Sequence, residues 1–246
     1  KYCSSLTSIT IPDSVTSIGE RAFEDCTSLT TVTIPDGVTS IGGNAFGSCT
    51  SLNTVNLPER FAENYESLAL SAEQVFIYDG RLTGDWTYTV SDNQATITGY
   101  LGDGVEVEIP SVVDELAVVK VGNEAFKNNT SVTSITIPDS VTSIGDFTFF
   151  SCTSLTNVTI GNSVTSIGHS AFYNCGLLSI TIPDSVTSIG TYAFNACSSL
   201  TSITIPDGVT SIGRDTFYEC TSLTSVTLPD SVTSIGEAAF KYCSSL

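Results

Sequence analysis

A repeat of 23 residues constrains the fold of this chain more than any other feature of its sequence. Cysteine recurs with this step at Cys3, Cys26, Cys49, Cys152, Cys175, Cys197, Cys220 and Cys243. Within the two runs, the step falls to 22 residues only after Cys175, where the loop before Leu177 is one residue short. A short, fixed period is typical of solenoids, in which each repeat is one coil stacked on the next.

One complete unit, from Leu200 to Cys220, has the pattern of a strand followed by turns. Apolar and polar residues alternate over Ser202–Ile205, as in a strand with one buried face. Pro206 and the aspartate after it favour a turn and would end the strand. Phe217 and the cysteine three residues later would fill the far side of the coil. The unit therefore predicts one coil with apolar residues on both sides of its interior.

No unit of this size can bury its own apolar face, so the coils must stack. Each coil would hide its large apolar side chains against its neighbours, which stabilises the fold by roughly 1.5–3 kcal/mol per side chain. Residues 23 apart should then lie over one another as successive rungs. The core ladder that we expect consists of Phe149, Phe172, Phe194, Phe217, Cys152, Cys175, Cys197 and Cys220.

The spacing Leu-x-x-Ile-x-Ile-Pro-x-x-Val-x-x-Ile-Gly-x-x-Ala-Phe-x-x-Cys resembles the BspA-like leucine-rich repeats of bacterial and protist surface proteins. The resemblance covers residues 1–58 and about 105–246. It implies a leucine-rich-repeat solenoid, a right-handed α/β-type superhelix that is mostly β with short turns. No asparagine occupies the turn after the strand, so we expect no ladder of asparagine side chains inside the coils.

The repeat is interrupted over residues 58–104, which suggests two arrays. Residues 1–78 would be the C-terminal part of a first array. Phe61, Tyr65 and Leu68 lie on one face of a short helix, so a helical cap is expected at about 59–70. Residues 79–84 would be a linker. Residues 85–246 would form a second array that begins with a β-hairpin cap at about 85–104 and is truncated at its C-terminal end.

The cysteines leave two alternatives open. Neighbouring coils lie roughly 5 Å apart, near the Cα separation that a disulfide tolerates, but side chains stacked in parallel form a poor geometry for bridging. The other alternative is a column of free thiols, which behave as small apolar side chains in a core. No Cys-x-x-Cys pair or histidine cluster accompanies them, so we expect neither a metal nor a cofactor.

An aspartate follows a proline in six coils, at Asp13, Asp36, Asp139, Asp184, Asp207 and Asp230. A stack of carboxylates would suit calcium, which prefers oxygen ligands. The simpler interpretation is a turn-forming Pro-Asp pair repeated six times, because the loop lacks a dense set of oxygen donors and Asn162 interrupts the column.

The outward side of the strands is the candidate binding face. Its hydroxyl and amide side chains would project away from the core as a broad, neutral, hydrogen-bonding surface. The second array contributes Ser134, Thr136, Asn157, Thr159, Ser179, Thr181, Ser202, Thr204, Ser225 and Thr227. Such rows also occur on ice-binding solenoids, which leaves that use as a remote alternative beside calcium-dependent binding.

The amino-acid composition limits the classes of partner that this chain can bind. The net charge of −18 repels phosphate backbones and anionic lipid headgroups, and no apolar run is long enough to cross a bilayer. We therefore expect no nucleic acid and no direct membrane insertion. No nucleophile elbow, phosphate loop or zinc motif appears, and the sole histidine, His169, has no column of partners, so we do not expect an enzyme.

The resemblance implies an extracellular or cell-surface module that adheres to a protein ligand, either host matrix or another cell-surface protein. The alternative is a structural spacer whose number of coils sets the reach of another domain. We expect the signal and the anchor to lie in other parts of a longer protein. The first and last six residues are identical, so end-to-end self-association of the truncated repeat is also expected.

Overall fold

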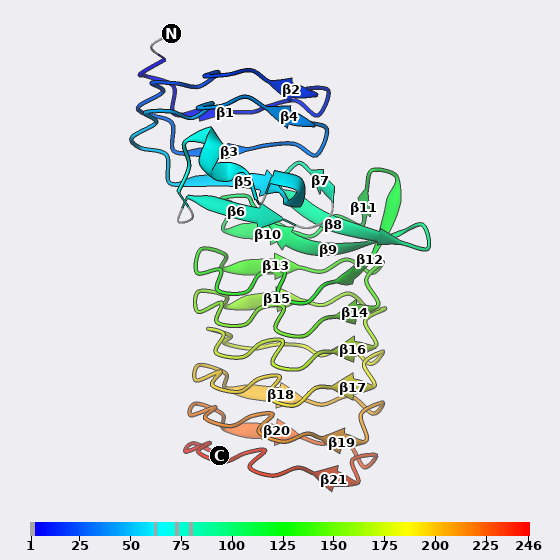
Figure 1. Cartoon of the computed structure of the whole chain (residues 1–246). Helices are drawn as coiled ribbons and strands as arrows, with labels where there is room; N and C mark the ends of the chain where they lie inside the picture. The colour runs from blue at the N-terminus through cyan, green and yellow to red at the C-terminus, as the bar shows by residue number, and fades with distance from the viewer. Residues whose placement is uncertain (1–2, 62, 72–73, 79–80) are drawn as a thin grey trace. The chain divides into compact units, whose positions relative to one another are not determined.

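The computed structural model describes residues 3–61, 63–71, 74–78 and 81–246, and it shows a β-solenoid with almost no helix. The chain divides into two compact units, Lys1–Thr87 and Tyr88–Leu246 (Figure 1). In both units successive coils pair through parallel strands. The predicted class, a mostly β leucine-rich-repeat solenoid, is confirmed.

In the first unit, the leading strand of each coil joins one parallel sheet, in the order β1-β3-β5-β6. Its strands are β1 (Ser8–Ile9), β3 (Thr31–Thr33), β5 (Thr54–Pro58) and β6 (Val75–Tyr78). The second strands, β2 (Ser17–Ile18) and β4 (Ser40–Ile41), pair with each other. Ser8 lies opposite Thr31 and Thr31 opposite Thr54, so residues 23 apart are rungs of one ladder.

The segment between β5 and β6 forms two short 3₁₀ turns in place of the single helix expected at about 59–70. These are η1 (Glu59–Phe61) and η2 (Tyr65–Leu68). Asn64 separates them because its backbone is not helical, with φ −124° and ψ 3°, and Ala69 ends η2 in the left-handed region at φ 66°. Phe61 and Leu68 are nevertheless buried against the core of the first unit.

The expected linker at 79–84 is described only in part. Residues 79 and 80 lie outside the described residues, and Arg81–Thr83 form strand β7, so that part of the linker is a strand. Strand β8 (Trp86–Ser91) is adjacent to β9 (Gln94–Tyr100) in a sheet. Asp92 and Asn93 join them with φ of 51° and 60°, the backbone of a two-residue hairpin turn.

The second unit has two strand-bearing sides. On the first side, β10 (Glu106–Glu108), β13 (Ser134–Thr136) and β15 (Asn157–Thr159) pair in that order, and β18 (Ser202–Thr204) pairs with β20 (Ser225–Thr227).

On the second side the sheet order is β17-β16-β14-β12-β9-β8. Its later strands are β12 (Leu116–Val121), β14 (Ser143–Ile144), β16 (Ser166–Ile167) and β17 (Ser188–Ile189). Strand β11 (Val112–Val113) pairs with β12, and β19 (Ser211–Ile212) with β21 (Ser234–Ile235).

The third side of each coil consists of turns, and backbone hydrogen bonds link these turns from coil to coil. Residues such as Asp215 and Glu219 adopt left-handed backbones, with φ of 52° and 59°. Their N–H groups donate to the next coil, at 3.0 Å to the carbonyl of Glu237 and 2.9 Å to that of Lys241. The cost of the strained backbones, of order 1 kcal/mol each, is offset by this third ladder.

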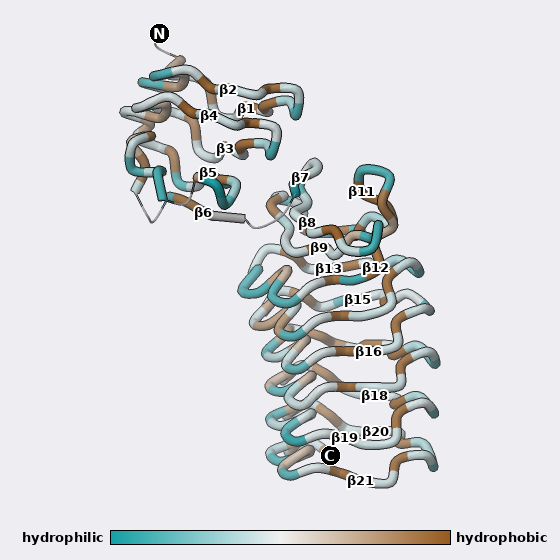
Figure 2. The backbone as a smooth tube through the Cα atoms, turned by 45° about the vertical axis from the view of Figure 1, so that its right-hand side comes forward, coloured by the Kyte–Doolittle hydropathy of each residue, from teal (hydrophilic) through white to brown (hydrophobic). Residues whose placement is uncertain are grey.

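The aromatic side chains of the core form a continuous row. In the second unit, Phe172, Phe194, Phe217 and Phe240 stack at centroid distances of 5.4, 5.6 and 5.3 Å, with interplanar angles of 4°, 2° and 7°. Tyr100, from the hairpin, continues the row at 5.7 Å from Phe126. Figure 2 shows the apolar positions recurring at the same place in successive coils.

Candidate binding surfaces

The first strand side carries the expected outward row. In β18 the burial pattern is exposed, buried, exposed, because Ile203 enters the core and its two neighbours leave it. The same pattern places Thr136, Asn157 and Thr159 at the surface, whereas Ser134 is half-buried. Ser225 and Thr227 are exposed on β20. The coil geometry therefore brings these side chains onto one face of two short sheets.

Ser179 and Thr181 are exposed, but they are not on a strand. Residues 177–182 have no strand assignment, so the coil between β15 and β18 interrupts this side. This is the coil that lacks one residue after Cys175. A Cβ at Gly176 would lie 2.4 Å from the Thr153 carbonyl oxygen, so the shortened loop packs closely on the preceding coil. Ser179 and Thr181 are therefore exposed, as expected, but they do not lie on a strand.

Two kinds of threonine differ in what their hydroxyls do. The threonines directly before β13, β15, β18 and β20 donate to the preceding coil, as Thr156 does to Thr133 O at 3.2 Å and Thr224 to Thr201 O at 3.0 Å. Among the described residues, the hydroxyls of Thr136, Thr204 and Thr227 on the strands have no hydrogen-bond partner. The strand hydroxyls are therefore available to a ligand.

Six of the eight thiols of the cysteine column are buried. Each cysteine is free, and the thiol of Cys220 donates to the Phe194 carbonyl oxygen at 3.1 Å. Cys152, Cys175 and Cys197 repeat this contact with the phenylalanine of the coil before. Burial raises the pKa of Cys197 from its usual 9.0 to about 12. The thiol of Cys197 therefore stays protonated at neutral pH, and the thiols of the column satisfy carbonyls that face the core.

The aspartates after the prolines take part in the turns. Asp139 accepts the backbone N–H of Asn162 at 2.7 Å, and Asp36 pairs with Arg60 at 2.8 Å. Within the described ranges, no three His, Cys, Asp or Glu side chains gather as metal ligands would. Both aspartate contacts join neighbouring coils.

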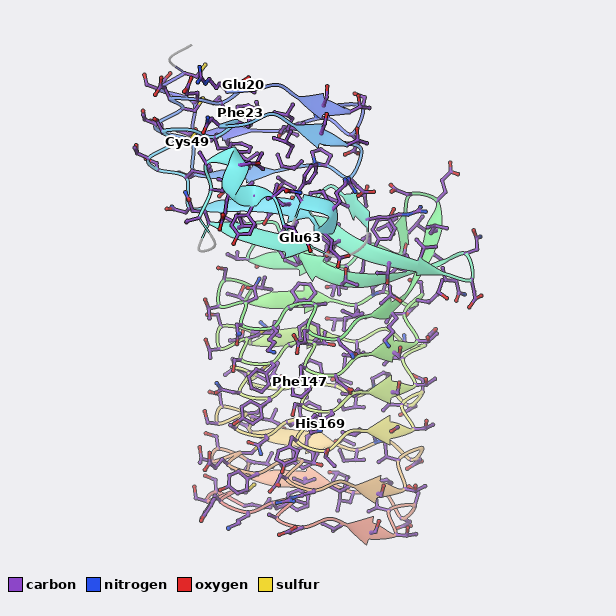
Figure 3. All side chains as sticks on the ribbon, in the orientation of Figure 1. Glu20, Phe23, Cys49, Glu63, Phe147 and His169 are labelled. Carbon is purple, nitrogen blue, oxygen red and sulfur yellow. The ribbon has the colours of Figure 1, made fainter. Side chains whose placement is uncertain are left out.

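A second surface, on the turn side, was not found by sequence reasoning. It is an open depression of about 510 Å³ over the later coils, lined by residues that include Tyr173, Tyr192, Asp215 and Tyr218. His169 lies beside it on the same side, with its ring 5.0 Å from Phe147 and 5.4 Å from Tyr192 (Figure 3). The only signal in the sequence was the aromatic character of positions that differ from coil to coil.

A comparison with known protein families matches most of the chain. The family described as BspA type Leucine rich repeat region matches residues 1–74 and 119–246 in six copies. The chain belongs to the BspA-type leucine-rich repeat family. No curated protein sequence matches this family member significantly. None of the described helices is long and apolar enough to cross a membrane.

Solved structures of leucine-rich repeat proteins resemble this BspA-type chain. It is 29% identical to the Treponema pallidum (T. pallidum) leucine-rich repeat protein, with a TM-score of 0.56 over 68% of this chain and 90% of that one. A leucine rich cell surface protein from Faecalibacterium prausnitzii is 32% identical, with a TM-score of 0.58 over 91% of this chain and 54% of that one. A leucine-rich repeat protein from Bacteroides ovatus is 26% identical, with a TM-score of 0.54 over 97% and 73%. The chain thus spans about half the length of the F. prausnitzii protein.

Proposed function

We propose that this chain is an extracellular binding module that adheres to a protein ligand through the outward face of β13, β15, β18 and β20. The ligand would be a host-matrix or cell-surface protein. A single observation carries the proposal. The strand hydroxyls of Thr136, Thr204 and Thr227 have no partner among the described residues, whereas the threonines directly before β13, β15, β18 and β20 each donate to a backbone carbonyl.

Two further observations support this proposal. The side chains of this face are uncharged, and most of them can both donate and accept hydrogen bonds. Such a face suits an interface with many polar contacts, some of them through water. The family is one of bacterial surface type, and the F. prausnitzii relative is described as a cell surface protein. A location at the cell surface or outside the cell fits this setting.

The experiment places the purified chain on beads and measures their retention on a surface coated with basement-membrane matrix. The variant Thr204→Lys with Thr227→Lys puts two long cations on neighbouring rungs of the face. We expect retention to fall roughly tenfold, which corresponds to about 1.4 kcal/mol of binding free energy. Circular dichroism checks that the fold is kept.

A matched control places the same charges on the other strand side. Ser211 and Ser234 are exposed and lie opposite each other in β19 and β21. Ser211→Lys with Ser234→Lys should leave retention unchanged. Equal losses in both double variants, or no loss in either, would contradict a role for the first strand side.

The alternative function is a spacer that sets the reach of another domain. The observation that favours it is the ladder itself, since each coil pairs only with its neighbours in register and length grows with the number of coils. A spacer would tolerate both double variants, but would lose function when the coil from Ser202 to Thr224 is deleted.

A further inference from the structure

The depression on the turn side is built by the same repeat positions in consecutive coils. The position directly after the buried phenylalanine carries Tyr173, Asn195, Tyr218 and Lys241 in turn. The position two residues before that phenylalanine carries Tyr192, Asp215 and Ala238. The two rows lie side by side along the solenoid, so the depression is a trough that crosses successive coils.

The aromatic rings of the trough are held in place by their neighbours. Tyr173 stacks on Phe150 at 4.6 Å with an interplanar angle of 9°, and Tyr218 contacts Tyr242 edge to face at 5.2 Å. Tyr173, Tyr192 and Tyr218 are each half-buried, so one part of every ring packs on the coil and another faces solvent. The small side chain of Ala238 and the buried side chain of Asn195 also line the trough.

The polar groups of the trough converge on Asp215, which is only 7% exposed. Arg214 Nε lies 2.9 Å from its carboxylate and 3.6 Å from that of Glu237, and Asn195 Nδ2 donates to the Asp215 carbonyl at 3.4 Å. The nearby carboxylate of Asp215 raises the pKa of Tyr192. These contacts fix the orientation of several donors and acceptors at one point of the surface.

The charges of the trough nearly cancel. Arg214 and Lys241 face Asp215, Glu219 and Glu237, and Arg214 engages two of the three carboxylates. Such a site has no strong preference for an ion of either sign. The net charge of −18 on the whole chain further disfavours a polyanion.

We propose that this trough binds a neutral oligosaccharide, extended along the solenoid across several coils. A sugar ring presents a C–H face that packs on an aromatic ring and hydroxyls that both donate and accept. The half-buried tyrosines supply the first contact, and the arginine, asparagine, phenol and carboxylate groups supply the second. A ligand made of repeating units also suits a site whose rungs repeat at 5.3–5.6 Å, the ring spacing beneath it.

This site is separate from the strand face of the proposed function. Tyr192 and Tyr218 belong to the turns, whereas Thr204 and Thr227 belong to the first strand side. The two proposals therefore fail independently. The strand-face variant Thr204→Lys also serves as a control for saccharide binding.

The experiment is isothermal titration of the whole chain with cellohexaose, xylohexaose, mannohexaose, laminarihexaose and chitohexaose. We expect at least one of these to bind with a dissociation constant on the order of 1 mM or below. Tyr218→Ala should weaken that binding at least about tenfold. Tyr218→Phe, which keeps the ring, should retain most of it, and Thr204→Lys should change nothing.

Three results would overturn the proposal. The first is no heat of binding with any of the five saccharides. The second is binding that Tyr218→Ala leaves intact while circular dichroism shows a folded variant. The third is binding of a lysine-rich peptide, with no saccharide bound, which would make the trough a site for cations on aromatic rings and carboxylates.

Discussion

Phe194 and Phe217 stack with their ring centroids 5.6 Å apart and their planes within 2° of parallel, although they lie 23 positions apart in the sequence. Both are fully buried. Each coil thus buries its phenylalanine against the same residue of the next coil, and loss of one ring removes contacts on both of its sides.

Phe217→Ala should therefore lower the free energy of unfolding by roughly 3–5 kcal/mol, the usual cost of deleting a buried phenylalanine. Urea unfolding followed by circular dichroism measures this. Phe150→Ala in an earlier coil is the comparison, since Phe150 is half-buried, and it should cost clearly less. A similar, small loss in both variants would mean that the row does not hold the core together.

The buried thiols should make stability depend on pH in alkaline solution. Cys197 titrates at its usual 9.0 when unfolded and at about 12 when buried, so the folded state keeps the proton longer. Its contribution is complete below pH 9 and is lost as the pH rises to about 12, at up to 1.4 kcal/mol per pH unit. Urea unfolding between these limits should show a shallower slope in Cys197→Ala. If the pH dependence of the unfolding free energy is the same in Cys197→Ala, this thiol does not contribute to it.

The two kinds of threonine should respond differently to loss of the hydroxyl. Thr201 donates to Leu178 O at 3.2 Å, whereas Thr204, three residues later, has no partner among the described residues. Thr201→Val should cost roughly 0.5–1.5 kcal/mol of unfolding free energy. Thr204→Val should be neutral or slightly stabilising, because valine favours strands. Thermal unfolding of both variants tests the pair, and a larger loss for Thr204→Val would contradict the hydrogen-bond assignment.

The glycine after the second strand is required in those coils whose backbones approach each other closely at this position. A Cβ on Gly190 would lie 2.6 Å from the backbone of Gly168 and His169, while a Cβ on Gly19, at the same repeat position, would meet nothing within 4 Å. Gly190→Ala should destabilise by roughly 1–3 kcal/mol through overpacking, and Gly19→Ala should not. Calorimetric melting of the two variants gives the comparison, and equal shifts would show that the approach of the coils is not the cause.

The features that recur at the same position in every coil could be predicted from the sequence. The spacing of Phe194 and Phe217 was enough to expect their stacking, and the alternation around Ile203 was enough to place its neighbours outside. The trough was missed because Tyr173, Asn195, Tyr218 and Lys241 share one repeat position but carry three different residue types. The turn-side ladder was missed because it depends on left-handed backbones at non-glycine residues such as Asp215, which no side-chain pattern reveals.

The first strand side is interrupted in the coil that lacks one residue after Cys175, and we expect the length of this coil to be the cause. In full-length coils, Ile137 N–H donates to Thr159 O at 2.9 Å and Ile205 N–H to Thr227 O at 3.0 Å. Among the described residues, the equivalent amide of Ile182 has no such partner.

Hydrogen exchange should therefore be faster at Ile182 than at Ile205. Insertion of one serine between Gly176 and Leu177 restores the 23-residue step and frees the loop from the close approach to Thr153. The coil should then pair in register with β15 and β18, and exchange at Ile182 should slow roughly five- to tenfold, the effect of about 1 kcal/mol from one hydrogen bond. If exchange at Ile182 does not slow, the interruption arises from the side chains of this coil and not from its length.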